Sequence, residues 1–304
     1  MTRMKLGLMS VTYAGFFYSG NALTIEEMIP KAARLGFDGL ELLGRAPHAS
    51  PLEMDRGART RARTLAEAEH IEIAAIGGQT DFSFPDARIR EWCLLHLVET
   101  IRLANDLGAP IVRVFANGVD SMRTDASYLQ QWNWAKEALK CASGAAERAG
   151  VVLALQNHAP IMHSYRHVLE MIEEVGSPAL KACIDPHCLW WADEPMDQAV
   201  QDCGALLVHS HLEDFRTLAS HLEFFNPKGW IKYTDWEFCP LGQGHVDHRS
   251  FVAALKTIGY GGYLVYPVCG PVHRGHELAL APMSHIDDLV GQALQYMKGL
   301  TQIA

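Results

Sequence analysis

Three apolar runs in the middle of the chain each end in side chains that can bind a metal ion or transfer a proton. The runs cover residues 151–155, 182–184 and 205–208, and the groups after them are Gln156-Asn157-His158, Asp185-Pro186-His187 and His209-Ser210-His211. A divalent cation needs several oxygen or imidazole ligands that converge from separate elements. The runs therefore predict one polar constellation at the ends of three consecutive strands.

Asp185 and His211 are the metal ligands that the sequence predicts, because they follow neighbouring apolar runs. Gln156 adds an amide oxygen from the preceding run. His209 shares a face with His211, but inward positions of one strand lie at successive depths, so we expect His211, nearer the end, to be the ligand. The alternative is that these groups hydrogen-bond to one another and line a wet pocket without metal.

His158 and His187 are the predicted catalytic residues. His158 lies two residues after Gln156, on the same side of an extended chain, where it can act as a general base or bind a substrate hydroxyl. The alternative is a loop histidine that only forms hydrogen bonds. The same two interpretations apply to His187.

Three further residues are predicted to bind substrate. Glu41 lies close to the end of an early strand, Trp190 can stack on a sugar face, and Arg216 can clamp a hydroxyl or phosphate oxygen. Packing is the alternative for Trp190. A surface pair with the nearby Glu213 or Asp214 is the alternative for Arg216, and we favour it slightly.

The elements that position these residues alternate between strands and helices. Apolar runs predict strands at residues 6–11, 37–42, 71–76, 111–115, 151–155, 182–184, 206–208 and 263–266. Helical spacing and capping signals predict helices at residues 24–36, 56–70, 86–107, 128–149, 167–175, 196–203, 249–258 and 286–300. Eight alternations predict an α/β fold, a (β/α)8 TIM barrel of parallel strands with outer helices. A doubly wound open sheet is disfavoured, because no glycine-rich phosphate turn follows the first strand.

Residues 216–247 follow neither the strand nor the helix period and are rich in aromatic side chains. The pattern predicts a long loop. Its aromatic content favours an ordered cover over a linker.

The bulk composition limits the class of protein. A chain of 304 residues with 49% apolar content is predicted to form one barrel domain over residues 1–304. The formal charge of -9 is spread along the chain without a basic stripe, which argues against nucleic acid or an anionic membrane as the main partner. Seven scattered cysteines without a CxxC pair indicate reduced thiols, and no run has the length of a signal or membrane segment. We expect a cytoplasmic protein with a small polar ligand.

The order of the strand-end motifs is similar to that of a known superfamily. The motifs LALQNH, IDPH, HSHLED, GQGHVD and GGYLVYPVCG, between Leu6 and about Met297, resemble the xylose isomerase-like barrels, usually labelled sugar phosphate isomerase/epimerase. The resemblance implies a divalent metal, commonly manganese, held by Glu, Asp, His and Glu at the ends of strands five to eight. Asp185 and His211 match the Asp and the His.

Both glutamates of that pattern are replaced in this chain. Gln156 stands where strand five usually has Glu, and Pro267 stands where strand eight usually has the second Glu. In the epimerases of this superfamily the two glutamates also exchange the substrate proton, so a two-base mechanism is not expected. The metal is then held by Gln156, Asp185, His211 and waters, or with help from His158, His187, His273 or His276, while a histidine moves the proton.

The resemblance implies an isomerase or epimerase that acts on a sugar, keto-sugar or cyclitol through an enediolate-type intermediate. One alternative is a lyase acting on a 3-keto-glycoside, in which His158 is the single base and a metal or His187 stabilises the oxyanion. A second alternative is a degenerate barrel that binds a sugar without turnover, or a subunit that needs a partner. Homo-oligomerisation stays open.

Overall fold

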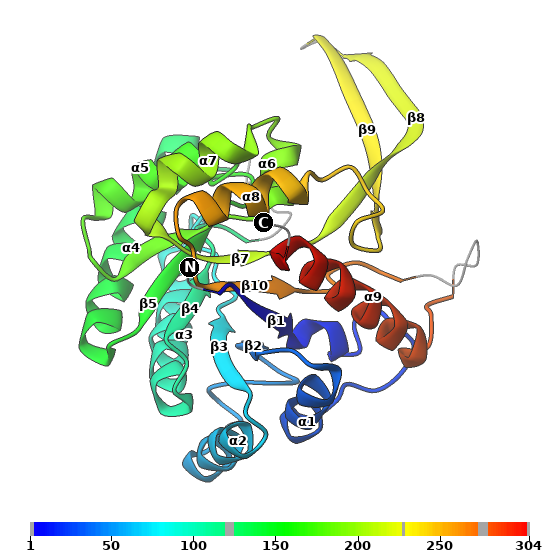
Figure 1. Ribbon diagram of the computed structural model, residues 1–304. Coiled ribbons are helices and arrows are strands. Elements are labelled where there is room, and N and C mark those ends of the chain that lie inside the picture. Colours follow the sequence, from blue (N-terminus) through cyan, green and yellow to red (C-terminus); the bar gives the residue numbers. More distant parts are fainter. Residues whose placement is uncertain (1–2, 119–124, 227–228, 273–278, 303–304) are drawn as a thin grey trace.

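The computed structural model describes residues 3–118, 125–226, 229–272 and 279–302, with side chains described outside 218–236. Eight parallel strands close into a barrel in the order β1-β10-β7-β6-β5-β4-β3-β2 (Figure 1). The strands are β1 (Lys5–Met9), β2 (Gly39–Leu43), β3 (Glu72–Gly77), β4 (Ile111–Val114), β5 (Val152–Gln156), β6 (Leu180–Cys183), β7 (Leu207–His211) and β10 (Tyr263–Tyr266). The predicted (β/α)8 barrel is confirmed.

Helices follow the strands and cover the outside of the barrel (Figure 1). They are α1 (Ile25–Leu35), α2 (Arg56–Ala68), α3 (Ala87–Leu107), α4 (Tyr128–Ala149), α5 (Tyr165–Val175), α6 (Pro186–Trp191), α7 (Met196–Cys203), α8 (His248–Thr257) and α9 (Met283–Gln302), with short 3-10 turns η1 (Ser10–Tyr13) and η2 (Gly204–Leu206). Local signals set their ends. The α1 capping box pairs Thr24 with Glu27, and Gly36 ends the helix at φ 91°.

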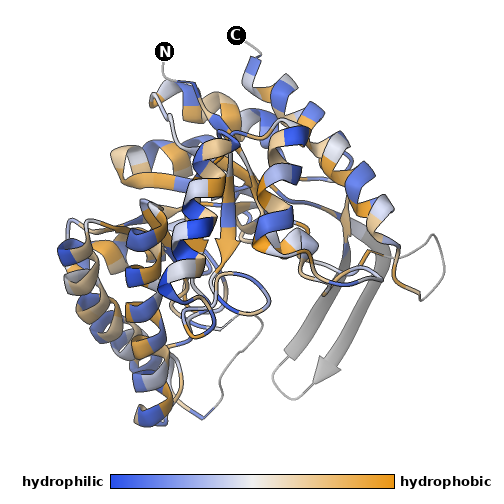
Figure 2. Ribbon diagram, turned by 90° about the horizontal axis from the view of Figure 1, so that it is seen from below, coloured by the Kyte–Doolittle hydropathy of each residue, from blue (hydrophilic) through white to orange (hydrophobic). Residues whose placement is uncertain are grey.

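The main apolar core joins the strands to these helices. Leu40, Leu153 and Leu264 are fully buried on the sheet and belong to the same cluster as Ile29 and Leu139 on the helices. Figure 2 shows hydrophilic and hydrophobic residues along each outer helix, as expected for elements with one solvent face. Within the described ranges, none of the helices has both the length and the apolar character needed to cross a bilayer.

The predicted long loop at 216–247 is wrong in its secondary structure. Most of it forms an antiparallel hairpin of β8 (Asp214–Asn226) and β9 (Gly229–Cys239), which projects from the barrel in Figure 1. The aromatic and β-branched residues that suggested a cover are also strand formers, and the two runs pair with each other. The sequence prediction also omitted the short helix α6, which begins at Pro186, a residue favoured in the first helical turn.

Candidate active site at the strand ends

Asp185 and His211 lie together at the carboxyl ends of β6 and β7, as predicted. The Asp185 carboxylate is 3.1 Å from His211 Nδ1 and accepts the backbone N–H of His211 at 2.7 Å. The backbone N–H of Asp185 in turn donates to Asn157 Oδ1 at 2.8 Å. Both side chains are buried, so these contacts hold the pair in one geometry.

Asp185 and His211 each stabilise the charged form of the other. Burial opposes the charged form of Asp185, but the neighbouring His211 outweighs it and holds the pKa of the carboxyl well below its usual range. Burial would likewise lower the pKa of His211, but the carboxylates of Asp185 and Glu41 raise it well above its usual value. Without a cation, both ring nitrogens of His211 therefore donate to carboxylates.

Gln156 and Cys183 complete the surroundings of Asp185. Gln156 Nε2 donates to Asp185 Oδ2, and Gln156 Oε1 is buried without a hydrogen-bond partner among the described residues. The Cys183 thiol lies 3.6 Å from Asp185 Oδ1 and 3.8 Å from His211 Nδ1. Sulfur, carboxylate and imidazole atoms all lie within 4.8 Å of one another in this group. The donors present therefore suit a divalent cation.

Glu41 lies on the other side of His211 and is wholly buried. Its Oε2 accepts from His209 Nε2 and from His211 Nε2, each at 2.7 Å, and its Oε1 accepts from Arg113 at 3.3 Å. Burial opposes its charge, but His211 and Arg113 outweigh this and hold the pKa of Glu41 well below its usual range. Glu41, which we predict to bind substrate, is thus engaged by three protein side chains.

Sequence reasoning missed Arg113 and gave no role to Cys183. Arg113 had a signal, because it is the one charged residue in the apolar run of β4, and a buried charge needs a partner. We interpret the seven cysteines as reduced thiols, and the residue type of Cys183 alone indicates no further role. His209 was weighed only against His211, whereas both contact the same Glu41 oxygen.

His187 is buried and pairs with Glu213. Its Nε2 lies 3.5 Å from Glu213 Oε2, and its ring contacts Trp191 at a centroid distance of 5.0 Å. Burial lowers the pKa of His187 to about 3 and raises the pKa of Glu213 to about 8. Near neutral pH the pair is therefore an uncharged imidazole beside a carboxylic acid, and the acid can supply a proton.

His158 is half-buried after β5, on the same strand end as Gln156. Its Nδ1 donates to the carbonyl oxygen of Ala159 at 2.9 Å, which leaves Nε2 as the proton acceptor. The ring packs edge-on to Phe115 at 5.2 Å. A positive charge on His158 would further lower the pKa of His187.

The structure does not bring the other predicted substrate-binding residues to this cluster. Arg216 is exposed on β8 and pairs across the hairpin with Glu237. This is a surface pair, although with a partner other than the two that we considered. Trp190 is half-buried on α6 with its ring 6.2 Å from that of His245. Pro267 is buried after β10, and His273 and His276 lie outside the described residues.

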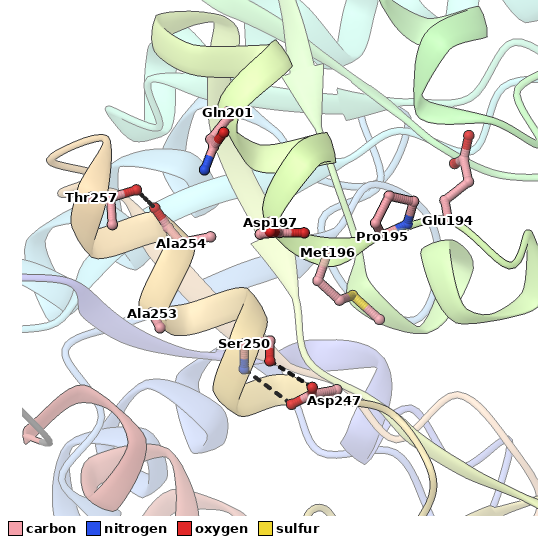
Figure 3. Close-up of a pocket in the computed structure, with 10 residues that line it drawn as sticks. All are labelled: Glu194, Pro195, Met196, Asp197, Gln201, Asp247, Ser250, Ala253, Ala254 and Thr257. Atoms are coloured by element: carbon pink, nitrogen blue, oxygen red, sulfur yellow. Dashed lines mark hydrogen bonds between the residues drawn. The ribbon is translucent and has the colours of Figure 1, made fainter.

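A pocket lies on the outside of the barrel, between α7 and α8 (Figure 3). Its volume is about 600 Å³, and it is lined by Glu194, Pro195, Met196, Asp197, Gln201, Asp247, Ser250, Ala253, Ala254 and Thr257. The Asp247 carboxylate accepts the backbone N–H of Ser250 and caps the N-terminus of α8, which is a structural role. The lining contains none of the strand-end residues, and the cluster around Asp185 remains the candidate active site.

Comparisons with known proteins agree with the barrel fold. The family model described as "Xylose isomerase-like TIM barrel" matches residues 29–298. A 3-oxo-isoapionate decarboxylase of Pectobacterium atrosepticum is 24% identical over 83% of this chain and 81% of its own. A fructoselysine 3-epimerase of Shigella flexneri is 24% identical over 82% of this chain and 87% of its own.

Among solved structures, a D-psicose 3-epimerase with D-tagatose from Clostridium cellulolyticum superposes with a TM-score of 0.76 and 17% identity, covering 99% of this chain and 100% of the other. A 3-keto-D-glucoside 4-epimerase from E. coli has a TM-score of 0.71 and 16% identity, covering 98% of this chain and 100% of its own. At these identities the superpositions establish the fold.

Proposed function

Because the chain belongs to the xylose isomerase-like TIM barrel family, we propose that it acts on a sugar, keto-sugar or cyclitol through an enediolate-type intermediate. The names of its relatives support this class of chemistry. Epimerisation at carbon 3 of a ketose and loss of carbon dioxide from a 3-oxo acid both create negative charge on a carbon beside a carbonyl. The observation that carries the proposal is the buried and braced Asp185–His211 pair at the strand ends.

A divalent cation is part of this proposal. Asp185, His211 and Gln156 are its ligands, and manganese is the cation that the family resemblance implies. When bound, such an ion polarises a carbonyl or enediolate oxygen of the substrate. Two observations support the site: Gln156 Oε1 has no hydrogen-bond partner among the described residues, and Asp185 Oδ2 lies 3.1 Å from His211 Nδ1.

His158 is the proposed base. The positions of the two glutamates that usually exchange the proton hold Gln156 and Pro267, neither of which can do so. His158 is the half-buried histidine of the cluster, and its Nε2 is left as an acceptor. His187 is the second candidate, and burial lowers its pKa to about 3, which makes it a weak base near neutral pH.

A lyase is the second candidate function. It is favoured by Gln156 and Pro267, which replace the two glutamates that a two-base epimerase needs. Elimination from a 3-keto-glycoside needs one base and an oxyanion stabiliser, and decarboxylation of a 3-oxo acid needs no base in its bond-breaking step. A sugar-binding barrel without turnover, a subunit of a larger assembly and a homo-oligomer are further outcomes that experiments can distinguish. We place the protein in the cytoplasm, as its cysteine usage suggests.

The test is solvent exchange at the carbon next to the carbonyl. A panel of ketoses, 3-keto-glycosides and 3-oxo sugar acids is incubated with the metal-supplemented protein in D2O and followed by proton NMR. We expect at least one member to incorporate deuterium or to lose its leaving group. His158→Gln should lower that rate by about 100-fold or more while ligand binding is retained.

His285→Gln on α9 is the matched control, because His285 is exposed and lies outside the cluster. It should leave the rate unchanged. Wild-type turnover that persists in His158→Gln removes this residue from the mechanism. Binding of a panel member with no exchange or cleavage by any variant would instead favour the non-catalytic sugar-binding barrel.

A further inference from the structure

Cys183 occupies the face of His211 where a cation would bind. Its Sγ lies 3.8 Å from His211 Nδ1 and 3.6 Å from Asp185 Oδ1. Cys183 ends β6 and Asp185 follows two residues later, so one strand end supplies both donors. The three side chains are buried, with their donor atoms within 4.8 Å of one another.

Glu41 determines which nitrogen of His211 is available for a cation. Since the Glu41 carboxylate accepts from His211 Nε2 at 2.7 Å, the Nε2 proton stays in place and Nδ1 is the nitrogen that a metal can use. Arg113 and His209 hold Glu41 by its two oxygens. The imidazole is thereby turned with Nδ1 towards Asp185 and Cys183.

Simple packing explains another buried thiol of this chain better than it explains Cys183. Cys203 on α7 is a member of the main apolar core. The polar contacts of Cys183, in contrast, are to a carboxylate and an imidazole, which are the usual companions of a metal-bound sulfur.

We propose that Cys183 is a metal ligand in this protein and takes the place of a missing glutamate, so that the centre prefers a zinc-like cation over manganese. The inference rests on the proposed cation site at Asp185 and His211. On binding, bonds form to the metal from Cys183 Sγ and from His211 Nδ1, and the thiol proton and the Nδ1 proton are both released to solvent. A set of thiolate, imidazole and carboxylate suits Zn²⁺ or Co²⁺, whereas Mn²⁺ favours oxygen ligands.

Three protein ligands leave a position for water or a substrate oxygen, as in catalytic zinc sites. The rival thiol is Cys188, which forms a separate donor group with Asp185 and His187. Cys183 is favoured because it contacts both members of the pair that the backbone and Glu41 hold in place.

Cobalt substitution tests this proposal. Co²⁺ is added to the chelator-treated protein, and its content is measured by elemental analysis alongside the absorption spectrum. A thiolate ligand gives an intense sulfur-to-cobalt charge-transfer band in the near ultraviolet, and ligand-field bands in the visible report cobalt regardless of sulfur. We expect the wild type to show both.

Cys183→Ser should lose the charge-transfer band, retain visible bands and bind Zn²⁺ at least about tenfold more weakly, with little change in Mn²⁺ affinity. Cys203→Ser, a buried thiol in the apolar core, and Cys188→Ser should keep the band. Circular dichroism melting checks that each variant is folded.

Bound cobalt without a charge-transfer band in the wild type, or a band lost in Cys188→Ser and kept in Cys183→Ser, overturns the assignment of Cys183. If the wild type binds cobalt without the band and Asp185→Ala no longer binds cobalt, the proposed cation site stands without the thiol. No cobalt binding in any folded variant overturns both the thiolate ligand and the cation site.

Discussion

Glu41 is the residue whose role differs most from what its position in the sequence suggested. It neutralises Arg113 and orients two imidazoles from a wholly buried position. Carboxylates that orient metal-binding histidines typically contribute 10–100-fold to metal affinity. The substrate contact that we predicted for Glu41 stays a prediction, whereas its contact with His211 is seen directly.

Glu41→Gln should weaken Zn²⁺ binding by roughly 10–100-fold, because the neutral amide orients His211 less firmly. It should also destabilise the fold by about 3–5 kcal/mol, because Arg113 is left as an unpaired buried charge. Chelator competition measures the affinity, and urea unfolding measures the free energy of unfolding.

Glu67→Gln is the control for this variant. Glu67 forms an exposed pair with Arg63 on α2, so its loss should change stability by no more than about 0.5 kcal/mol. Equal metal affinity in wild type and Glu41→Gln would contradict the orienting role.

At the residue scale, the sequence identified the polar groups that interrupt apolar runs. Asp185, His211 and Gln156 could be predicted because parallel strands end at the same mouth of a barrel. The carboxylate that accepts from His211 Nε2 could not be predicted. It belongs to Glu41, which comes 170 positions earlier in the chain and reaches His211 only because the barrel closes. Cys183 resembles an ordinary buried thiol until its neighbours are known.

At the scale of elements, one carboxylate organises the turn between the hairpin and α8. The Asp214 side chain accepts the backbone N–H groups of Gly242, Gly244 and Val246 at 2.9 to 3.2 Å. A Cβ at position 244 would lie 2.1 Å from Asp214 Oδ1. Gly244 is therefore required by this close approach.

Gly244→Ala should destabilise the protein by about 2 kcal/mol or more, because neither Asp214 nor the nearby backbone oxygen of Phe215 can move without losing hydrogen bonds. The matched control is Gly291→Ala within α9, where, apart from the adjacent residues and the helix's own backbone, no described atom lies within 4 Å of the new Cβ. That change should stabilise by roughly 0.5–1 kcal/mol. Guanidinium unfolding measures both, and a neutral effect at position 244 would show that the turn is adaptable.

Elements were predictable where their signals are local. The helices at 128–149 and 196–203 match the prediction at both ends, because caps and breakers lie beside them in the sequence. The hairpin at 214–239 was not predicted, because the pattern was compared with buried barrel strands. Exposed antiparallel strands need only pair with each other and do not require a continuous apolar run.

At the scale of the whole molecule, the two sheets differ in how their strands pair. β10 completes the barrel by pairing with both β1 and β7, whereas β8 and β9 pair with each other in a separate sheet. Strand count alone predicted the barrel. The prediction of one domain over residues 1–304, made from the chain length and the 49% apolar content, stays a prediction.

Replacing residues 218–236 by a short Gly-Asn turn should therefore leave the barrel folded, with a melting temperature within a few degrees of wild type. Truncation after residue 261, which removes β10 and α9, should abolish cooperative unfolding, because the barrel is left with two open edges. Circular dichroism melting measures both variants. Loss of folding in the hairpin variant would mean that the hairpin packs against the barrel or a second copy as an essential part.

The most direct test of the account is the metal content of the protein purified without chelator, measured by elemental analysis. We predict close to one divalent transition-metal ion per chain in the wild type and almost none in a variant that combines Asp185→Ala with His211→Ala. No bound metal in the wild type, even after reconstitution with zinc, cobalt and manganese salts, would contradict it. The strand-end cluster would then be a hydrogen-bonded network, and catalysis would depend on the histidines alone.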